Sequence, residues 1–264
     1  MALMECSLFA ESIGMCTNVN VILPQPTSGQ IGLTGVGSPD GCPVLYLLHG
    51  LSDDHSIWLR RTCIERYATQ FGIAVVMPNG HRSFYADVEK NGLRYWNYIS
   101  EELPALIDGI FKFSQKREDT FVAGLSMGGY GSFKLALNKP ERFAAAGCFS
   151  SVIRPWRFVD AAPDRKLEMS SIYGDDTGLI ENTFHDPYWL AEQHVKNGTA
   201  LPEFYIACGT EDFLYQENIM YRDHLRRLGV SFEYVEGPGT HEWGFWDRHV
   251  LAYLNWLKTK NLLH

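Results

Sequence analysis

A serine lies between two glycines in the segment Gly124-Leu125-Ser126-Met127-Gly128, which follows the pattern G-x-S-x-G. An apolar stretch precedes it and a helix-compatible stretch follows it, the strand–turn–helix setting in which this pattern presents a nucleophilic serine. The turn is so sharp that side chains at Gly124 and Gly128 would collide with their surroundings. The N–H of Met127, at the start of the following helix, favours a developing negative charge. We therefore interpret Ser126 as a nucleophile rather than as a chance match.

A serine hydroxyl is weakly nucleophilic and needs a general base. In proteins with this pattern the acid and then the histidine follow the serine along the chain. His241 lies in a loop directly after the last predicted strand and before the last predicted helix, so it is the candidate base. We expect His224, which is surrounded by arginines in a predicted helix, to be solvated. The other histidines after Ser126 lie in a segment without strands, in the last helix or at the chain end: His185, His194, His249 and His264.

The third member of such a triad is a carboxylate that holds the histidine in the right tautomer. Glu211 and Asp212 both follow the penultimate predicted strand. Adjacent loop residues generally point in different directions, so one of the two is expected to face His241, and we favour Asp212. Asp212 also suits the N-cap of the helix that follows it, and the two roles conflict only in part.

An oxyanion hole needs a second N–H donor beside that of Met127. This donor is expected from the loop after the first strand of the main sheet, which begins His49-Gly50-Leu51. Gly50 allows a tight backbone turn, so the N–H of Leu51 is the candidate donor. We interpret His49 as a residue that braces the loop and assign it no catalytic role.

The elements that must position these residues alternate between strands and helices. Runs that are apolar at every position predict strands covered on both faces, as in parallel sheets. The expected fold is therefore α/β, with a mostly parallel central sheet and helices on both faces, in a single domain over residues 1–264. The predicted strands are 44–48, 73–77, 120–125, 143–149, 204–208 and 232–235, and the predicted helices are 56–70, 99–113, 128–137, 216–228 and 243–257.

Two regions depart from this alternation. Residues 7–13 and 18–23 suggest antiparallel strands at one edge of the sheet, followed by a Gly-, Pro- and Ser-rich loop over 24–42. Residues 153–198 contain no clear strand but many aromatic side chains, between two predicted strands. We expect this segment to be a short helical insertion at the end of the sheet where substrates enter. It acts either as a cap or as a peripheral packing unit, and the two roles are compatible.

The composition of the 264 residues excludes several classes of function. With 23 Lys and Arg against 31 Asp and Glu, the net charge is −8, which argues against a nucleic-acid or anionic-membrane partner. No stretch approaches the ~20 apolar residues that span a bilayer, and glutamates interrupt the N-terminal segment, unlike a signal peptide. The six cysteines are scattered without paired spacing, so we expect reduced, mostly buried thiols in a cytoplasmic protein with no metal site.

Several motifs together resemble the esterase D / S-formylglutathione hydrolase-like family of α/β-hydrolases, and most closely the bacterial tributyrin esterases. The resemblance runs from about Pro43 to Leu257. It is carried by residues 124–131, 49–51 with Trp58 nearby, 77–80, 82–85, 98–104, 209–212 and 239–243.

Placed on this sequence, the resemblance implies Ser126 as nucleophile, Asp212 as acid and His241 as base, with the main-chain N–H groups of Leu51 and Met127 as the oxyanion hole. It implies a serine carboxylesterase that needs no cofactor and hydrolyses short-chain acyl esters of the acetyl, butyryl or tributyrin type. Members of the family are commonly dimers or tetramers, so a homo-oligomer is expected by analogy.

Alternative functions remain at this point. They are an S-formylglutathione hydrolase or other thioesterase, a feruloyl or other aryl esterase, a peptidase, and a non-catalytic binding protein with the hydrolase fold. The segment 83–98 is shorter than in S-formylglutathione hydrolases, which weighs against thioester specificity. Trp58 and Trp243 are candidate substrate contacts. The sequence shows no acidic or basic pocket signature for a charged leaving group.

Overall fold

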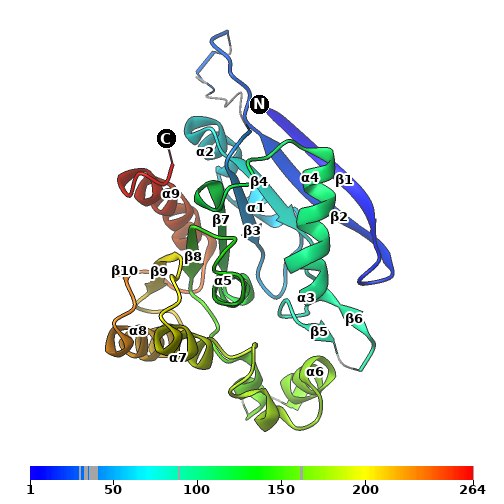
Figure 1. Ribbon diagram of the computed structural model, residues 1–264, viewed down its shortest axis with the longest axis vertical. Coiled ribbons are helices and arrows are strands. Elements are labelled where there is room, and N and C mark those ends of the chain that lie inside the picture. Colours follow the sequence, from blue (N-terminus) through cyan, green and yellow to red (C-terminus); the bar gives the residue numbers. More distant parts are fainter. Residues whose placement is uncertain (30, 33–34, 36–40, 89, 161–162, 264) are drawn as a thin grey trace.

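An eight-stranded sheet forms the centre of the molecule, in the order β1-β2-β4-β3-β7-β8-β9-β10, with β1 and β2 at its outer edge (Figure 1). Six strands of this sheet run parallel to one another, namely β4, β3, β7, β8, β9 and β10. Strand β2 is antiparallel to both β1 and β4. The structure is a computed structural model and describes residues 1–29, 31–32, 35, 41–88, 90–160 and 163–263. The strands of the sheet are β1 (Ala2–Ala10), β2 (Met15–Leu23), β3 (Val44–Leu48), β4 (Ala74–Pro78), β7 (Thr120–Leu125), β8 (Ala145–Phe149), β9 (Glu203–Gly209) and β10 (Phe232–Gly237).

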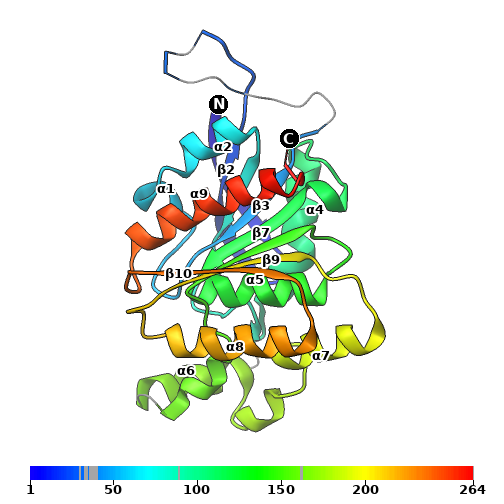
Figure 2. The same ribbon diagram turned by 90° about the vertical axis from the view of Figure 1, so that its left-hand side faces the viewer.

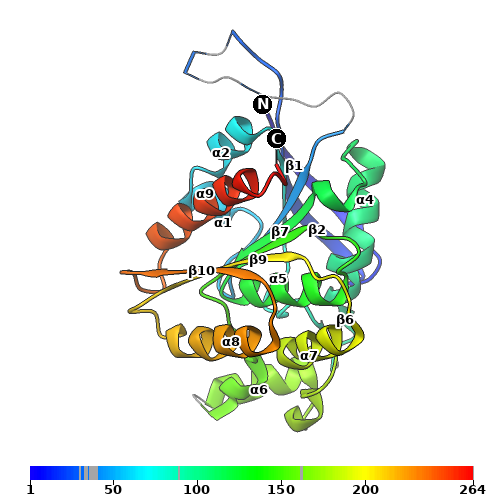
Figure 3. The ribbon, with the colours of Figure 1, turned by 60° about the vertical axis from the view of Figure 1, so that its left-hand side comes forward.

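Helices cover both faces of this sheet (Figures 2 and 3). On one face pack α1 (Ile57–Arg61), α2 (Ile64–Phe71) and α9 (Trp243–Thr259). On the other pack α4 (Leu103–Ile110), α5 (Met127–Asn138) and α8 (Tyr215–Leu228). The remaining elements before β7 are the hairpin β5 (Asp87–Val88) and β6 (Leu93–Arg94), α3 (Tyr95–Asn97), a π-helical turn (Tyr98–Glu102) and a 3₁₀ turn (Arg117–Asp119).

The central strands are buried on both sides, which explains why their sequences are almost entirely apolar. In β3 the side chains of Tyr46 and Leu48 join one hydrophobic core, and those of Leu45 and Leu47 join the other. Successive side chains of a strand point to opposite faces, so only a continuous apolar run fills both cores. The expected fold, a mostly parallel sheet with helices on both faces, is confirmed.

The predicted helix over 56–70 is wrong in one respect, because the chain breaks it into α1 and α2. Thr62 is extended between them, and its hydroxyl accepts from the N–H of Ile64 at 3.2 Å. Asp247 of α9 accepts from the N–H of Cys63 at 3.0 Å. A contact between segments 184 residues apart therefore stabilises the break. The predicted helix over 99–113 likewise ends at Ile110, because Phe111 is extended.

The segment 153–198 is helical, and its two longer helices behave differently. α7 (Pro187–Asn197) packs against α5 and α8, whereas α6 (Pro163–Tyr173) projects from the end of the body (Figure 1). The 3₁₀ turns Pro155–Asp160 and Thr177–Ile180 flank α6. Residues 161–162 of this segment, and residues 30, 33–34 and 36–40 of the expected loop over 24–42, lie outside the described residues.

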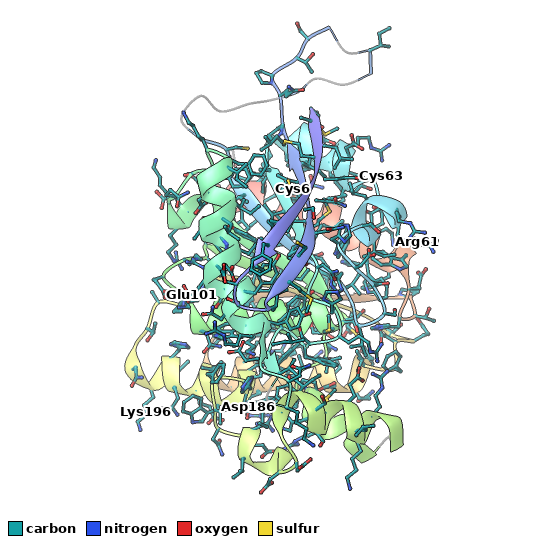
Figure 4. The ribbon with its side chains drawn as sticks, turned by 90° about the vertical axis from the view of Figure 1, so that its right-hand side faces the viewer. Cys6, Arg61, Cys63, Glu101, Asp186 and Lys196 are labelled. Carbon is teal, nitrogen blue, oxygen red and sulfur yellow. The ribbon has the colours of Figure 1, made fainter. Side chains whose placement is uncertain are left out.

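The expectation of mostly buried thiols is wrong. All six cysteines are free, but only Cys148 and Cys208 are buried; Cys16 and Cys63 are exposed, and the other two are half-buried. Figure 4 shows Cys6 on the outermost strand β1 and Cys63 near the outer surface. Within the described part of the chain, no helix combines the length and apolar character needed to cross a membrane.

Candidate active site

Ser126 occupies a strained turn between β7 and α5. Its φ of 54° and ψ of −114° place a non-glycine residue in a region that L-residues rarely adopt. A Cβ at Gly124 would lie 2.5 Å from the carbonyl carbon and oxygen of Gly128, and one at Gly128 would lie 2.7 Å from the carbonyl carbon of Leu48. The glycines on both sides of Ser126 are therefore required by close backbone approaches. The serine is 9% exposed and lies at the carboxyl end of the sheet.

His241 and Asp212 form a hydrogen-bonded pair. The imidazole Nδ1–H donates to Oδ2 of Asp212 at 2.9 Å, with Oδ1 at 3.1 Å. The Oδ1 atom also accepts from the N–H of Leu214 at 2.9 Å. Burial acts to raise the pKa of Asp212, but the hydrogen bonds from His241 and Leu214 outweigh it, so the pKa lies below its usual value. With the proton on Nδ1, the Nε2 lone pair of His241 is free to accept another proton.

Glu211, the adjacent carboxylate, has different partners. Its Oε2 accepts from the N–H of Gly239 at 2.6 Å, and its Oε1 accepts from the hydroxyl of Thr210 at 2.9 Å. It therefore shapes the loop that carries His241 without contacting the ring. The N-cap of α8 is Leu214 and not Asp212. The carboxylate of Asp212 accepts a hydrogen bond from the N–H of Leu214.

A cavity of about 400 Å³ opens over the serine. Its wall brings together residues from the loop after β3, the turn after β7, the insertion and the loop before α9. Asp212 lies behind His241 with its side chain fully buried. The lining residues are Gly50, Leu51, Ser52, Asp53, Arg82, Phe84, Leu125, Ser126, Val152, Pro155, Arg165, Met169, Phe213, His241, Trp243 and Trp246.

The two candidate oxyanion donors come from different elements. Met127 is the first residue of α5, where a backbone N–H has no partner within the helix. Leu51 lines the cavity in the loop after β3, which is held by a hydrogen bond from the N–H of Asp53 to the carbonyl of Gly50 at 3.2 Å.

The two tryptophans predicted to contact substrate lie in different environments. Trp243 lines the cavity, but Trp58 does not: it is 1% exposed and its indole N–H donates to the carbonyl of Leu48 at 3.0 Å. The rings of Trp58 and Trp243 meet edge to face at 5.3 Å. The direct contact predicted for Trp58 is therefore wrong: Trp58 packs against Trp243, the first residue of α9, and Trp243 is the one that lines the cavity.

The charged groups of the cavity wall were missed. Arg82 and Arg165 line the cavity and both pair with Glu168, at 2.6 Å and 2.9 Å. The sequence shows no basic pocket signature, and the structure is what places these two arginines in the cavity wall. Arg82 belongs to residues 82–85, one of the segments that carry the family resemblance, while Arg165 lies in the insertion, where no pattern identifies it.

The contacts of four other histidines belong to the packing and bracing of the fold. His224 is buried, not solvated, because α7 packs on α8 and brings Tyr188 to 4.7 Å from its ring. His185 lies beside the buried amine of Lys134 at 3.0 Å. His194 contacts the carbonyl of Leu137, and neither it nor His185 lines the cavity over Ser126. His49 does brace its loop, as expected, with Nε2 accepting from the N–H of Gly80 at 2.9 Å.

Comparisons with known proteins agree with this arrangement. A family model described as "Putative esterase" matches residues 10–257. An acetyl esterase from Caldicellulosiruptor saccharolyticus is 29% identical over 263 residues, covering 97% of this chain and 98% of that protein.

Two solved structures from Staphylococcus aureus are also similar. FphF, a fluorophosphonate-binding serine hydrolase, has a TM-score of 0.86 and 36% identity, covering 97% of this chain and 98% of its own. The S-formylglutathione hydrolase FrmB has a TM-score of 0.84 and 37% identity, with the same coverage. The resemblance to the esterase D / S-formylglutathione hydrolase-like group is thus confirmed. The chain belongs to the esterase family and is an enzyme of the serine-hydrolase class that acts on ester bonds.

Proposed function

We propose that the protein is a carboxylesterase for short-chain acyl esters, with Ser126 as nucleophile, His241 as general base and Asp212 as its partner. The observation that carries this proposal is the hydrogen bond between His241 and the buried carboxylate of Asp212, beside a cavity that also contains the strained Ser126. The N–H groups of Leu51 and Met127 are proposed to form the oxyanion hole. No cofactor is needed for this chemistry.

In the first half of the reaction, Nε2 of His241 takes the hydroxyl proton as Ser126 attacks the ester carbonyl. The negative oxygen of the tetrahedral intermediate accepts hydrogen bonds from the two backbone N–H groups. The carboxylate of Asp212 stabilises the imidazolium that forms. His241 then gives its proton to the departing alcohol, which leaves an acyl group on Ser126.

In the second half, water repeats the same steps. His241 removes a proton from the water, the hydroxide attacks the acyl-enzyme, and Ser126 leaves with the proton returned by the imidazolium. The products are an alcohol and a carboxylic acid, and the enzyme regains its starting state.

The size and lining of the cavity support a small acyl group. A volume of about 400 Å³ must hold both the acyl and the alcohol portions. Phe84, Leu125, Val152 and Trp246 give its wall an apolar surface. The similarity to an acetyl esterase supports the same choice. We also propose that residues 153–198 act in part as a cap, since Pro155, Arg165 and Met169 of that segment reach the cavity.

A second candidate is the hydrolysis of S-formylglutathione or a related thioester. Arg82 and Arg165 at the cavity wall suit a leaving group that carries carboxylates. The similar protein FrmB is an S-formylglutathione hydrolase, which supports the same candidate. A feruloyl or other aryl esterase is a weaker candidate that rests on the aromatic rim of Phe213 and Trp243. The free cysteines support a cytoplasmic location.

Paired serine variants test the proposed function. Ser126→Ala is expected to abolish turnover of p-nitrophenyl acetate and butyrate. Ser52→Ala, a matched control in the same cavity wall, is expected to retain most of the activity. Both variants should unfold at temperatures close to that of the wild type. Undiminished turnover by folded Ser126→Ala would refute the nucleophile. A series of acyl esters of increasing length, with a glutathione thioester included, then separates the first candidate from the second.

A further inference from the structure

His49 has two hydrogen-bond partners that the proposed reaction does not use. It follows β3 directly and is 1% exposed. Its Nδ1 lies 2.7 Å from the carbonyl oxygen of Gly50, and its Nε2 lies 2.9 Å from the backbone nitrogen of Gly80. The ring therefore bridges the loop after β3 to the loop after β4.

These partners leave only one tautomer for the imidazole. The N–H of Gly80 can only donate, so Nε2 must accept, and the carbonyl of Gly50 can only accept, so Nδ1 must carry the proton. Burial lowers the pKa of His49 to about 4, against a smaller opposing effect of the hydrogen bond to Gly50. His49 is consequently neutral near pH 7, which the bond from Gly80 requires.

The carbonyl that His49 binds belongs to the peptide unit whose N–H is that of Leu51. A trans peptide is planar, and its C=O and N–H point in opposite directions. A donor that fixes the oxygen of Gly50 therefore fixes the direction of the Leu51 N–H. From this geometry we infer that His49 is a positioning residue for the oxyanion hole, acting through the Gly50–Leu51 peptide. The inference rests on the proposed function, because it needs Leu51 to be an oxyanion donor.

Tyr85 holds the backbone of His49, whereas the two bonds above are made by its ring. Its buried hydroxyl donates to the carbonyl oxygen of His49 at 2.9 Å. Its own carbonyl accepts from the buried amine of Lys134 on α5 at 2.9 Å. Tyr85 thus connects the loop that carries Leu51 to the helix that begins at Met127, so the two proposed donors belong to one hydrogen-bonded unit.

The backbone of Tyr85 is strained to make these contacts. Its φ is 49°, an uncommon value for a residue with a side chain. Its ring leaves no room at Gly131 of α5, where a Cβ would lie 2.5 Å from the ring atom Cδ2. Such a conformation persists only where the surroundings determine it, which is typical of residues that support a functional site.

The test compares three variants of His49 and its surroundings. His49→Phe keeps a ring but removes both hydrogen bonds, while His49→Asn keeps an N–H donor near the position of Nδ1. His81→Phe is the control, because His81 lies in the loop after β4 without lining the cavity over Ser126. The measurements are kcat and KM for p-nitrophenyl acetate and the inhibition constant of a trifluoromethyl ketone, whose adduct with the serine imitates the oxyanion.

We expect His49→Phe to lower kcat by about 10- to 100-fold, less than the loss of a whole donor, because the Leu51 N–H is misaimed rather than removed. KM should change little, ketone affinity should fall in parallel with kcat, and His49→Asn should recover much of both. Wild-type kcat in folded His49→Phe, with Ser126→Ala inactive, overturns the role of His49 and leaves the proposed function standing. Activity in Ser126→Ala overturns the proposed function itself.

If His49→Phe does not fold, Tyr85→Phe decides the question. This variant removes one hydroxyl from the far side of His49, and one lost hydrogen bond is expected to lower kcat about fivefold. Parallel losses of kcat and ketone affinity in Tyr85→Phe support the inference. Wild-type values of both constants in Tyr85→Phe reject it.

Discussion

The guanidinium of Arg82 donates to the carboxylate of Glu168 at 2.6 Å, which ties the loop after β4 to helix α6 of the insertion. Arg165, one turn earlier in α6, binds the other oxygen of the same carboxylate at 2.9 Å. Both arginines line the cavity over Ser126. One carboxylate therefore partly neutralises two cations in the wall of the cavity over Ser126.

Substituting Glu168 by Gln is expected to change substrate preference more than stability. Glu168 is half-buried, but its arginine partners are 55% and 40% exposed, and ion pairs with solvent-exposed partners contribute at most about 1 kcal/mol each, so the free energy of unfolding should fall by about 2 kcal/mol or less. The freed arginines should lower KM for an ester that carries a carboxylate, such as a p-nitrophenyl hemisuccinate, relative to the butyrate. The ratio of the two KM values, measured at low and at high salt, checks this.

Glu181→Gln is the matched control, because Glu181 pairs with Arg157 outside the cavity. It should leave the KM ratio unchanged. An equal ratio in Glu168→Gln and wild type would show that the arginine pair does not contact the substrate.

Asp212→Asn is expected to lower kcat by about 10⁴-fold, because an amide no longer stabilises the imidazolium or selects the tautomer. Glu211→Gln should lower kcat less than about tenfold, since Glu211 holds the loop at Gly239 and does not contact the ring. Steady-state kinetics with p-nitrophenyl butyrate compare the two. A larger loss from Glu211→Gln than from Asp212→Asn would reverse their roles.

Gly128→Ala is expected to destabilise the fold by about 3 kcal/mol or more, because the new methyl group overlaps the backbone of Leu48 and His49. Gly109→Ala is the control. Gly109 is itself exposed in α4, with nothing within 4 Å of a new Cβ, and the substitution should stabilise the fold by about 0.5–1 kcal/mol. Urea denaturation measures both changes. Equal stability in the two variants would argue against the tight packing of the turn at Ser126.

Stability should fall as the pH drops from about 6.5 to 4. Burial lowers the pKa of His49 and of His249 to about 4, so the unfolded chain binds protons in this window that the folded chain does not. In the folded protein both histidines stay neutral as the pH falls through this window, so the free energy of unfolding decreases. His249→Asn should reduce the slope of stability against pH by about one proton. An unchanged slope in that variant would mean that His249 titrates normally in the folded protein.

The fold and much of the site follow from local sequence patterns. The apolar runs that become β3, β4 and β7 are buried on both faces, and such runs predict parallel strands whatever the rest of the chain does. The glycine at position 124 reflects backbone overlap with Gly128, four residues away, whereas the glycine at position 128 reflects the close approach of Leu48 in β3. The order of Asp212 and His241 after neighbouring strands predicts their meeting, because parallel strands end at one edge.

The unpredicted features depend on contacts between distant segments. The pair of Arg82 and Glu168 spans 86 residues, and its helix carries no motif. The break before α2 depends on Asp247 of α9. The burial of His224 depends on where α7 packs. Neither composition nor periodicity encodes these contacts, since each is fixed only when the insertion and the last helix have taken their places.

The central claim is that Ser126, activated by His241, is the nucleophile, and covalent labelling tests it most directly. The purified protein is treated with a fluorophosphonate and mapped by mass spectrometry. We expect a single phosphonyl group on the peptide that contains Ser126, formed at least about 100-fold more slowly in His241→Ala. A label on another residue, or an equal rate of labelling in folded His241→Ala, would contradict it.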